Sequence, residues 1–530
     1  MLRAYSVPAY PFGIDRVLPS GDTVTLYLHG NERFHWYTLS DGSWVEFDSD
    51  GGLVLVDSLS ESEISDRMRS RRTLDATESA YPINKAPRGL IIMVNFSDIQ
   101  FQSSNTRSAI DEMHNGSNYT YNGATGSSGQ YFSEQSYGAY TPHFDVVGPV
   151  ELPRDCSYYG EDLSSSVIDI RADSMVVQAC RIADGSPWNV DFSRYDNDGD
   201  GEIDFVFILY AGYNEAEGGN EETLWPHSSE IYNEWHVDKR FDGKRVNKYA
   251  CSSELRLNKG SERAGIATFC HEFSHVLGLP DLYETYSSKV SHKTLGYWDI
   301  MDYGPYNNNG NTPPAYSAYE RFFLGWLTPY ILNSPCSVKL DELNSSGASC
   351  IVTTTGTHNL SGNNPNPLTF YTIENRQLMG WDKYIPGAGM LLERIHYSYY
   401  TWRMNRVNND ESDMGVDLIE ADGLTTKGMA GKATDAFPAG GDSYSPFEHY
   451  PITNISMSDG VIYFDFMGGG ELIDISSVTC AEATLSDEDV EIMGIYSITG
   501  ERMGVSDVGA LGSGIYLIQS NKGCKKIFIR

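Results

Sequence analysis

The sequence predicts a multidomain α+β protein whose central domain of helices and strands is flanked by β-rich segments. Three observations predict this fold class. Apolar and polar residues alternate as in strands over residues 1–85, strand and helix patterns alternate from Gly89 to about residue 330, and strand patterns return after Pro329. The chain has 530 residues, too many for one hydrophobic core, so we expect several domains.

The N-terminal segment predicts a small β-rich unit joined to the centre by an exposed linker. Its strand-like runs are separated by glycine-containing turns and cover Thr23–Leu28, Phe34–Leu39 and Trp44–Phe47. A polar run then ends in the basic stretch Arg67–Arg72, and two prolines follow it. This composition is typical of a linker that proteases can cut. We therefore treat residues 1–88 as one unit with its linker.

The remaining chain is predicted to form three domains, at residues 89–330, 331–470 and 471–530. The central domain begins with the apolar strand Leu90–Phe96 and contains a helical stretch near Ser165–Ile182 and a strand at Asp204–Tyr210. Downstream strands are expected at Phe370–Glu374, Gly389–Ile395, Val416–Glu420 and Gly460–Phe466. The final stretch from Val490 predicts a small β module.

The charge balance excludes several classes of partner. With 38 basic against 72 acidic residues, the formal net charge of -34 opposes binding to nucleic acid or anionic lipid and favours capture of cations.

No apolar run approaches the roughly 20 residues that span a bilayer, so we expect no membrane-spanning segment. The N-terminus lacks the charged-then-apolar pattern of an export signal, and we treat that signal as missing from this chain.

Eight cysteines are spread thinly along the chain, and none forms the CxxC pair that indicates a thiolate metal site. Disulfides are possible but not required. Cys336 and Cys350 bracket a stretch that a hairpin would close, and Cys480 and Cys524 flank the final segment. Cys270 is expected to be a small buried residue and not a ligand.

The segment Ala267–Asp281 carries the residues that predict the chemistry. A helix places His271 and His275 one turn apart on one face, so both imidazoles can reach one tetrahedral Zn²⁺. Glu272 then lies where it can deprotonate a water molecule at the metal. A bare HExxH motif also occurs by chance in ordinary amphipathic helices, so the residues that follow it decide its meaning.

The chain after the second histidine can supply a third ligand. Gly278 is placed to end the helix with a left-handed residue, and Pro280 prevents its continuation. The chain must therefore turn, and it can bring Asp281 under the metal. Glu284 and Glu320 are downstream carboxylates that could take the same place.

A second motif follows, in which Gly296–Gly304 places Met301 in a tight turn of the kind that metzincins have beneath their zinc site. With these two motifs the chain resembles the immune inhibitor A family of secreted metallopeptidases. The similarity spans roughly residues 5–465 and also includes Pro314–Trp326, Tyr371–Glu374 and Val416–Asp422. It implies a zincin, metzincin-like catalytic domain with a propeptide in front and β-sandwich-like domains behind.

The resemblance also implies roles for single residues. His271, His275 and Asp281 would bind zinc, while Glu272 would take a proton from water and return it to the leaving amine. Many family members have a small residue where this chain has Tyr303. The tyrosine resembles the serralysin and astacin pattern, in which it assists the metal or the oxyanion, and simple packing is the alternative.

The family pattern further implies that residues 1–88 are a propeptide that keeps the enzyme latent. No cysteine precedes Cys156, so a propeptide thiolate cannot cap the zinc. The block must then come from a carboxylate, from a histidine such as His29 or His35, from a methionine, or from steric cover of the cleft.

An acidic loop predicts a second metal site. Residues 196–204 place carboxylates at alternate positions around a glycine, as in the first nine positions of a calcium loop, and the family carries the same run. We expect a structural Ca²⁺ bound by Asp196, Asp198, Asp200, the carbonyl of Glu202 and Asp204. Phe207 stands where an EF-hand has its bidentate glutamate, and a solvated acidic turn is the alternative.

The last segment, Gly494–Arg530, resembles the C-terminal sorting domain of type IX secretion cargo, which implies a contact with secretion machinery. A stabilising β module is the alternative.

The sequence therefore favours a secreted or cell-surface zinc endopeptidase with protein or peptide substrates. We expect the strand Asp204–Tyr210 to offer an edge to which an extended substrate adds. The rival interpretation is a non-catalytic, calcium-stabilised surface or binding protein on a metallopeptidase scaffold, and the intact Glu272 argues against it.

Overall fold

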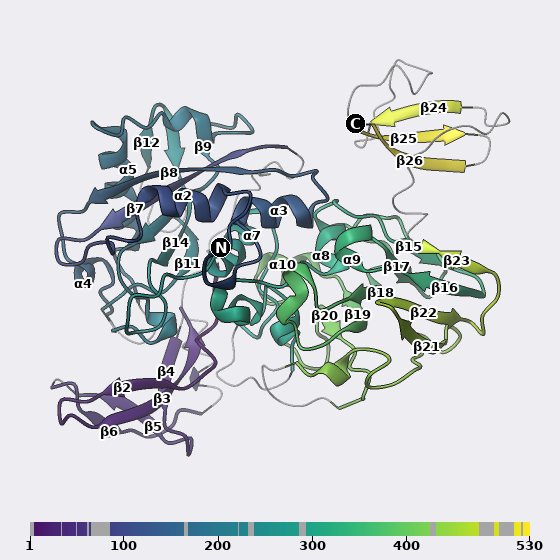
Figure 1. Cartoon of the computed structure of the whole chain (residues 1–530), viewed down its shortest axis with the longest axis horizontal. Helices are drawn as coiled ribbons and strands as arrows, with labels where there is room; N and C mark the ends of the chain where they lie inside the picture. Colours follow the sequence, from purple (N-terminus) through teal and green to yellow (C-terminus); the bar gives the residue numbers. More distant parts are fainter. Residues whose placement is uncertain are drawn as a thin grey trace.

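The computed structural model describes residues 5–32, 34–48, 50–60, 63–64, 85–163, 168–220, 222–231, 238–285, 293–424, 431–475, 492–497, 514–520 and 523–529. These residues form a mixed α/β molecule with few helices and numerous strands. In Figure 1 the N-terminal sheet, in purple, lies on one side of a central domain, and two further sheets, in green to yellow, lie on another side.

The central sheet has six strands in the order β1-β11-β14-β10-β7-β8. Its parallel strands are β7 (Arg88–Asn95), β8 (His143–Glu151), β10 (Val206–Tyr210) and β14 (Lys248–Ser253). At one edge, β11 (His227–Glu230) runs antiparallel to β14, and β1 (Tyr5–Ser6) runs antiparallel to β11. The apolar strands are expected to be buried on both faces, as in other parallel sheets.

Helices cover both faces of this sheet. Successive side chains of each strand point to opposite faces and therefore pack against different helices. Ile91 and Met93 of β7 pack with α2 (Arg107–Asn115), α3 (Ser128–Gln135) and α7 (Ala267–Val276). Leu90 and Ile92 pack on the other face with α4 (Cys156–Tyr159) and α5 (Ala172–Asp184). The helix predicted at Ser165–Ile182 falls partly outside the described residues, and within them it begins at Ala172 and ends at Asp184.

The prediction that Asp204–Tyr210 offers a free edge is wrong. β10 pairs with β14 on one side and with β7 on the other, and all five of its residues are buried. An apolar run without alternation is typical of an inner strand, which explains this position. The edge strand on the side of β11 is β1, which pairs with β11.

A short three-stranded sheet extends the central domain. It consists of β12 (Lys239–Phe241), β13 (Lys244–Val246) and β9 (Glu202–Ile203) in that order. The acidic loop lies directly before β9.

Two more sheets follow the helix α8 (Ala318–Phe323). One contains β15 (Tyr330–Leu332), β17 (Ser349–Val352), β18 (Thr369–Arg376), β19 (Gly389–His396) and β20 (Val416–Leu418). The other contains β21 (Ile452–Ser458), β22 (Val461–Phe466), β16 (Cys336–Leu340) and β23 (Leu472–Asp474). Residues of both sheets share one hydrophobic cluster, so the sheets pack face to face.

The downstream sheets also contribute to the core of the central domain. Phe370 of β18 and Leu391 of β19 belong to the same hydrophobic cluster as Phe273 of α7 and Phe322 of α8. The short helices α9 (Leu343–Ser346) and α10 (Tyr399–Arg403) lie in this region too. Residues far beyond position 330 are therefore in a position to support the active-site helix.

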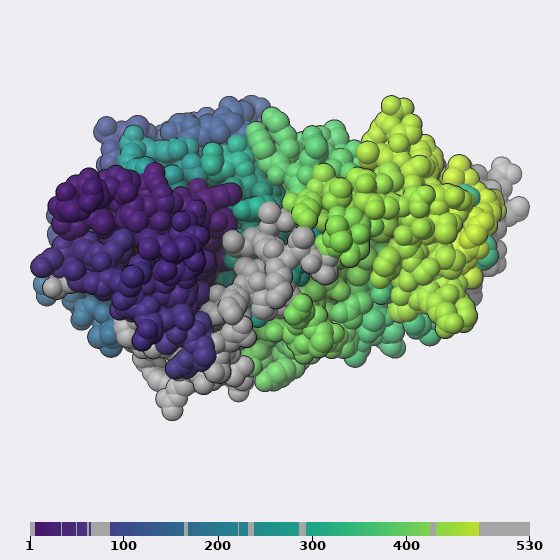
Figure 2. All heavy atoms as spheres, turned by 90° about the horizontal axis from the view of Figure 1, so that it is seen from below, coloured from purple at the N-terminus to yellow at the C-terminus, as the bar shows by residue number. Residues whose placement is uncertain are grey.

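The N-terminal unit is an antiparallel meander of β2 (Ile14–Val17), β3 (Thr23–Asn31), β4 (Phe34–Thr38), β5 (Trp44–Phe47) and β6 (Leu53–Leu55). Its predicted strands are confirmed. Leu26, Leu28 and Val45 share a cluster with Ile168 and Trp225 of the central domain, so the unit packs against that domain. Figure 2 shows the purple N-terminal residues against the blue and teal surface.

At the other end of the chain, the backbone forms β24 (Ile492–Ser497), β25 (Gly514–Ser520) and β26 (Gly523–Ile529), in agreement with the predicted β module. No helix among the described residues is long and apolar enough to cross a membrane.

Cys336 and Cys350 are free and buried, and they lie in different sheets, so they do not close the hairpin considered above. Cys270 is free and buried, as expected. Of the other suggested pair, Cys480 lies outside the described residues.

Candidate metal centre

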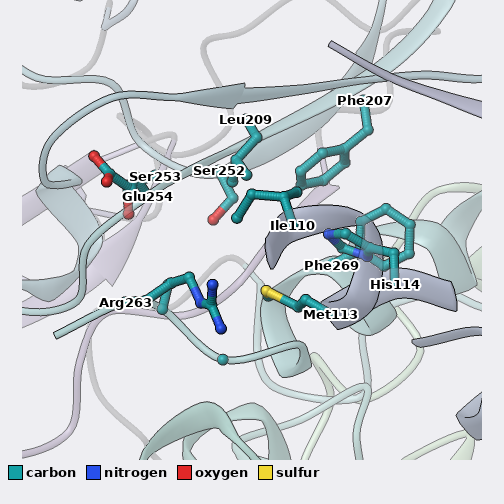
Figure 3. A pocket seen from close by; sticks show the side chains of 12 residues that line it. Ile110, Met113, His114, Phe207, Leu209, Ser252, Ser253, Glu254, Arg263 and Phe269 are labelled. Atoms are coloured by element: carbon teal, nitrogen blue, oxygen red, sulfur yellow. The ribbon is translucent and has the colours of Figure 1, made fainter. Parts of the chain in front are cut away.

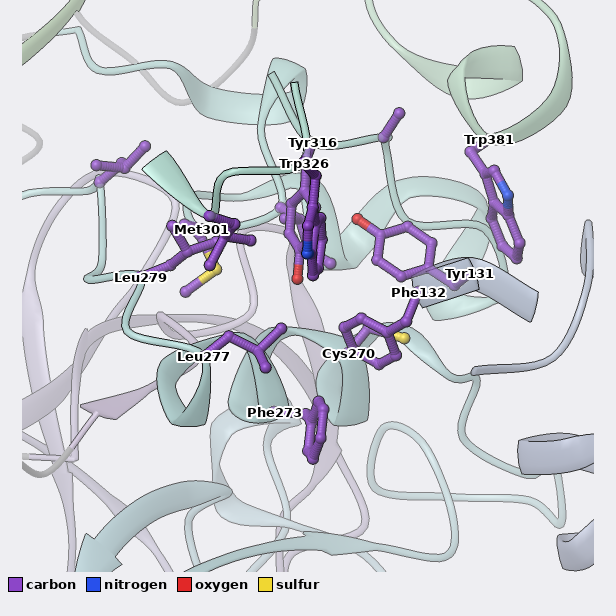
Figure 4. Packing of buried hydrophobic residues seen from close by; sticks show 14 of the residues in the cluster. Tyr131, Phe132, Cys270, Phe273, Leu277, Leu279, Met301, Tyr316, Trp326 and Trp381 are labelled. Atoms are coloured by element: carbon purple, nitrogen blue, oxygen red, sulfur yellow. The ribbon is translucent and has the colours of Figure 1, made fainter. Parts of the chain in front are cut away.

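Helix α7 is fixed in the core by the residues on either side of its histidines. Phe273 packs on Phe132 with ring centroids 5.0 Å apart, and Leu277 lies in the same cluster as Met301 (Figure 4). Gly278 then adopts a φ of 101° and its N–H bonds to the His275 carbonyl, so the helix ends in the predicted left-handed residue.

Three ligand atoms converge in front of this helix: His271 Nε2, His275 Nε2 and Asp281 Oδ1. The two nitrogens are 3.2 Å apart, and the carboxylate oxygen lies 3.2 Å from His271 Nε2 and 3.3 Å from His275 Nε2. Ligands of a tetrahedral zinc ion, each about 2.0 Å from the metal, are about 3.3 Å apart. The three atoms therefore outline one face of such a tetrahedron, and this donor set fits zinc with a fourth position left for water or substrate.

Both histidines are held in the tautomer that a metal requires. His271 Nδ1 lies 2.7 Å from the Ile300 carbonyl oxygen, and His275 Nδ1 lies 2.8 Å from the Leu279 carbonyl oxygen. A carbonyl oxygen only accepts hydrogen bonds, so each Nδ1 donates its proton and each Nε2 keeps a lone pair. Burial lowers the pKa of His275, which also favours the neutral ligand.

Asp281 is fixed by the turn at Met301 and by a loop from the downstream region. The N–H of Leu282 donates to the Met301 carbonyl at 2.7 Å. Asn405 donates to Asp281 Oδ2 at 2.5 Å and accepts from the Asp281 N–H at 2.7 Å. Burial by itself raises the pKa of Asp281, but the neighbouring imidazoles of His275 and His271 lower it overall. The carboxylate form that a metal binds is thus favoured.

The same loop holds the rest of the ligand turn. Asn408 donates to the Leu282 carbonyl at 2.8 Å, and Asn409 accepts from the Thr285 N–H at 2.9 Å. Trp402 of α10 donates to the Gly278 carbonyl at 3.1 Å. Sequence reasoning missed these residues, and the only signal was a run of asparagines more than a hundred positions from the ligands.

Glu272 is fully buried at the position next to His271. Its Oε1 accepts a hydrogen bond from the Val7 N–H at 3.2 Å, and its Oε2 has no hydrogen bond within the described residues. Burial, followed by the charges of Asp281 and Glu32, raises the pKa of the Glu272 carboxyl well above its usual value. Such a group takes up a proton readily, as a general base must.

The N-terminal residues run past Glu272 along the sheet edge. β1 pairs with β11 so that Tyr5 lies opposite Ser228 and Ser6 opposite His227. Ser6 Oγ donates to the buried carboxylate of Glu32 at 2.5 Å. The N-terminus accordingly lies next to α7 in Figure 1.

The other candidate residues lie apart from the converging ligand atoms. Glu320 accepts from the Ser317 N–H and caps α8, and Glu284 is not in the cluster of three. Tyr303 is buried, and its ring centroid lies 6.3 Å from that of Tyr283. Within the described residues, the Tyr303 hydroxyl makes no hydrogen bond, so both roles considered above for Tyr303 stay predictions.

Residues 84–326 match the profile of the immune inhibitor A peptidase M6 catalytic domain. This part of the chain is similar to M6 metallopeptidase domains. The match encloses α7, Asp281 and Met301, so the domain similarity and the converging ligand atoms refer to the same part of the molecule.

Curated relatives agree with this match. The chain is 26% identical over 216 residues to the pre-pro-metalloprotease PrtV of Vibrio cholerae, covering 37% of this chain and 23% of the relative. It is 25% identical over 221 residues to immune inhibitor A of Bacillus thuringiensis, covering 37% and 31%. A putative secreted metallopeptidase of Arthroderma benhamiae is 22% identical over 409 residues, covering 61% and 56%. The chain thus spans between 23% and 56% of the length of these relatives.

The acidic loop of the peptidase domain brings together three of its five predicted ligands. Carboxylate oxygens of Asp196, Asp198 and Asp200 lie within 4.8 Å of one another, and the latter two residues are exposed. Asp196 accepts from the Gly199 and Gly201 amides and pairs with Lys244 Nζ at 2.5 Å.

The remaining two predicted ligands have other partners. Asp204 Oδ2 accepts from the backbone and side-chain amides of Asn197 at 2.6 and 2.7 Å. Burial raises the pKa of Asp204 to about 6. The side chain of Glu202 pairs with Arg245, which leaves its carbonyl as the predicted ligand atom.

A further cluster of titratable side chains lies outside the candidate metal centre. His35 of the N-terminal unit lies 2.9 Å from Glu215, and Asp162 lies within 4.8 Å of both.

A small pocket on the sheet side of α7 is lined by His114, Arg263, Phe207 and Phe269, among others (Figure 3). Burial lowers the pKa of His114 to about 3, so this pocket presents a neutral imidazole.

Proposed function

We propose that this protein is a secreted zinc-dependent endopeptidase that hydrolyses extracellular proteins. The observation that carries the proposal is the triangle of His271 Nε2, His275 Nε2 and Asp281 Oδ1, with sides of 3.2 to 3.3 Å beside the buried Glu272. The similarity to metallopeptidases supports it. The folded arrangement of α7, the ligand turn and the Met301 turn is compatible with the metzincin-like zincin that the sequence implies.

The mechanism assigns each step of proton transfer to Glu272. A zinc ion held by His271, His275 and Asp281 would polarise the scissile carbonyl and would lower the pKa of a water molecule to about 7. Glu272 takes one proton from the water, whose oxygen forms a bond to the carbonyl carbon. When the C–N bond breaks, Glu272 returns that proton to the leaving nitrogen, so the products are a carboxyl group and an amine.

We further propose that residues 1–88 keep the full chain latent. The hydrogen bond from the Val7 N–H to Glu272 and the pairing of β1 with β11 support steric cover of the cleft. His29 bonds to Thr38, and His35 bonds to Glu215. These contacts favour cover by the extended segment over a histidine cap.

The remaining predictions stay proposals. A structural Ca²⁺ at Asp196, Asp198, Asp200, the Glu202 carbonyl and Asp204 is supported by the convergence of the first three carboxylates. It would have to displace Lys244 from Asp196. A role of residues 471–530 in secretion rests on the sequence resemblance alone.

A protein-digestion assay on wild type and Glu272→Ala tests the proposal, before and after cleavage of the linker at Arg67–Arg72 with trypsin that is then inhibited. We expect the cleaved wild type to digest casein and the cleaved variant to be inert. The rival function as a binding protein predicts that neither digests casein although both bind metal. Equal digestion by both would contradict the role of Glu272.

A further inference from the structure

The peptide bond between Ser6 and Val7 lies across the catalytic carboxylate. Its N–H donates to Glu272 Oε1 at 3.2 Å, and its carbonyl oxygen, on Ser6, accepts from the Tyr283 hydroxyl at 2.7 Å. Both polar groups of one peptide bond are therefore bound by residues of the ligand helix and the ligand turn. Tyr283 follows the metal ligand Asp281 by two positions and is itself buried.

The next two carbonyl groups are held in the same way. The Val7 carbonyl accepts from Trp225 Nε1 at 3.2 Å, and the Pro8 carbonyl accepts from the Tyr306 hydroxyl. On the other side of the bond, Tyr5 and Ser6 form a strand ladder with β11. Each of these contacts is made to a main-chain atom. The same donors would therefore meet any extended peptide that followed this path, whatever its side chains.

From this geometry we propose that Tyr283 donates a hydrogen bond to the carbonyl oxygen of the scissile bond, and that Trp225 and Tyr306 bind the two carbonyls on its C-terminal side. The inference rests on the proposed peptidase function and names the residues that grip its substrate. Tyr283 touches the reacting carbonyl and is thus a catalytic residue, whereas Trp225 and Tyr306 are positioning residues.

The role of Tyr283 follows from where charge develops. As the water oxygen bonds to the carbonyl carbon, the carbonyl oxygen gains negative charge, and a donor already at 2.7 Å stabilises it without reorganisation. The hydroxyl keeps its proton throughout, while the transferred proton travels on Glu272. The hydroxyl of Tyr303, the sequence candidate for this role, makes no hydrogen bond within the described residues, where only the main chain of Tyr303 is hydrogen-bonded.

The ligand turn keeps Tyr283 in place. Its neighbour Leu282 donates to the Met301 carbonyl and accepts from Asn408, and Thr285 is bound to Asn405 and Asn409. A hydroxyl on a backbone held at both sides is suited to a fixed donor position.

The same geometry explains how the segment can lie in the cleft as an inhibitor. The Val7 N–H contacts Glu272 Oε1 directly, so it occupies one of the two carboxylate oxygens to which an attacking water would donate. A substrate whose scissile N–H is turned away from Oε1 leaves that oxygen free for water, and it can still use Tyr283, Trp225 and Tyr306.

The test compares single variants of the full chain after linker cleavage and removal of the freed N-terminal segment, with a quenched fluorescent peptide as substrate. We expect Tyr283→Phe to lower kcat on the order of a hundredfold with little change in KM. Tyr306→Phe should raise KM roughly two- to tenfold and leave kcat unchanged, as loss of one neutral hydrogen bond predicts. Tyr297→Phe is the control, because this tyrosine stacks on Phe12 near the same cleft and should change neither constant.

A second readout does not depend on activity. In the uncleaved Glu272→Ala chain, adding Tyr283→Phe should speed hydrogen exchange at residues 5–10, whereas adding Tyr297→Phe should not. The proposal is overturned if Tyr283→Phe retains the wild-type kcat, or if Tyr303→Phe alone causes the loss of kcat. Failure of the proposed function looks different, since cleaved wild type would then hydrolyse no peptide.

Discussion

The central domain holds two clusters of side chains that could bind a metal ion, and the two are built in opposite ways. His271, His275 and Asp281 are buried. Groups from other segments, the Ile300 carbonyl and the Asn405 side chain, bond to His271 and Asp281, and the Leu279 carbonyl in the turn after α7 accepts from His275. In the loop of Asp196, Asp198 and Asp200, two of the three residues are exposed, and most hydrogen bonds of their carboxylates come from the loop's own backbone.

This difference shows what each cluster needs from the rest of the fold. The loop can be formed by about ten consecutive residues, because its amides face its own carboxylates. The buried cluster requires the Met301 turn and the loop around Asn405 in addition to α7. Its geometry is fixed by the folded protein, so changes there should affect catalysis, whereas changes in the acidic loop should affect stability.

The largest effect is expected for Glu272→Ala. The variant should retain its metal, since Glu272 is not among the converging ligands, and should lose peptide hydrolysis by at least about a thousandfold. Metal analysis and peptide turnover after linker cleavage check both parts. Loss of the metal together with activity would make Glu272 a ligand or a structural residue.

The next effect concerns the downstream loop. Asn405→Ala removes the partner of Asp281 Oδ2 and should weaken zinc binding by roughly ten- to a hundredfold, as loss of a ligand's hydrogen-bond partner does elsewhere. Competition with a chelator measures the affinity. Asn118→Ala, an exposed position with only a local contact, is the matched control. Equal affinities for the two variants would show that Asp281 needs no support from this loop.

Cleavage of the linker at Arg67–Arg72 is expected to raise specific activity roughly tenfold or more, because several main-chain hydrogen bonds, each about 1 kcal/mol, hold the N-terminal segment against Glu272, Trp225 and Tyr283. The comparison uses folded, zinc-loaded samples before and after cleavage. Equal specific activity would mean that the segment leaves the cleft unaided.

The smallest effect is expected in the acidic loop. Removal of calcium should lower the melting temperature by a few degrees, because clustered carboxylates repel one another without a cation. Asp198→Ala should show the lower melting temperature without any response to calcium. If wild type ignores calcium and a selective chelator, the loop is a solvated acidic turn in which Lys244 pairs with Asp196.

The two clusters also differ in how much of them the sequence predicted. Local patterns were enough for α7, the left-handed Gly278 and the approach of Asp281 to the histidines, because each depends on residues within one helix and one turn. Asn405 and the covering strand β1 were missed, since both contacts join residues more than a hundred positions apart. The edge strand was misplaced for a similar reason, because an apolar run does not show which neighbours it pairs with.

The most direct test of the central claim is a crystal structure with anomalous diffraction recorded on both sides of the zinc absorption edge. The account predicts one zinc peak about 2.0 Å from His271 Nε2, His275 Nε2 and an oxygen of Asp281. A peak bound by Glu284 or Glu320 in place of Asp281, or no zinc peak in a catalytically active sample, would contradict it.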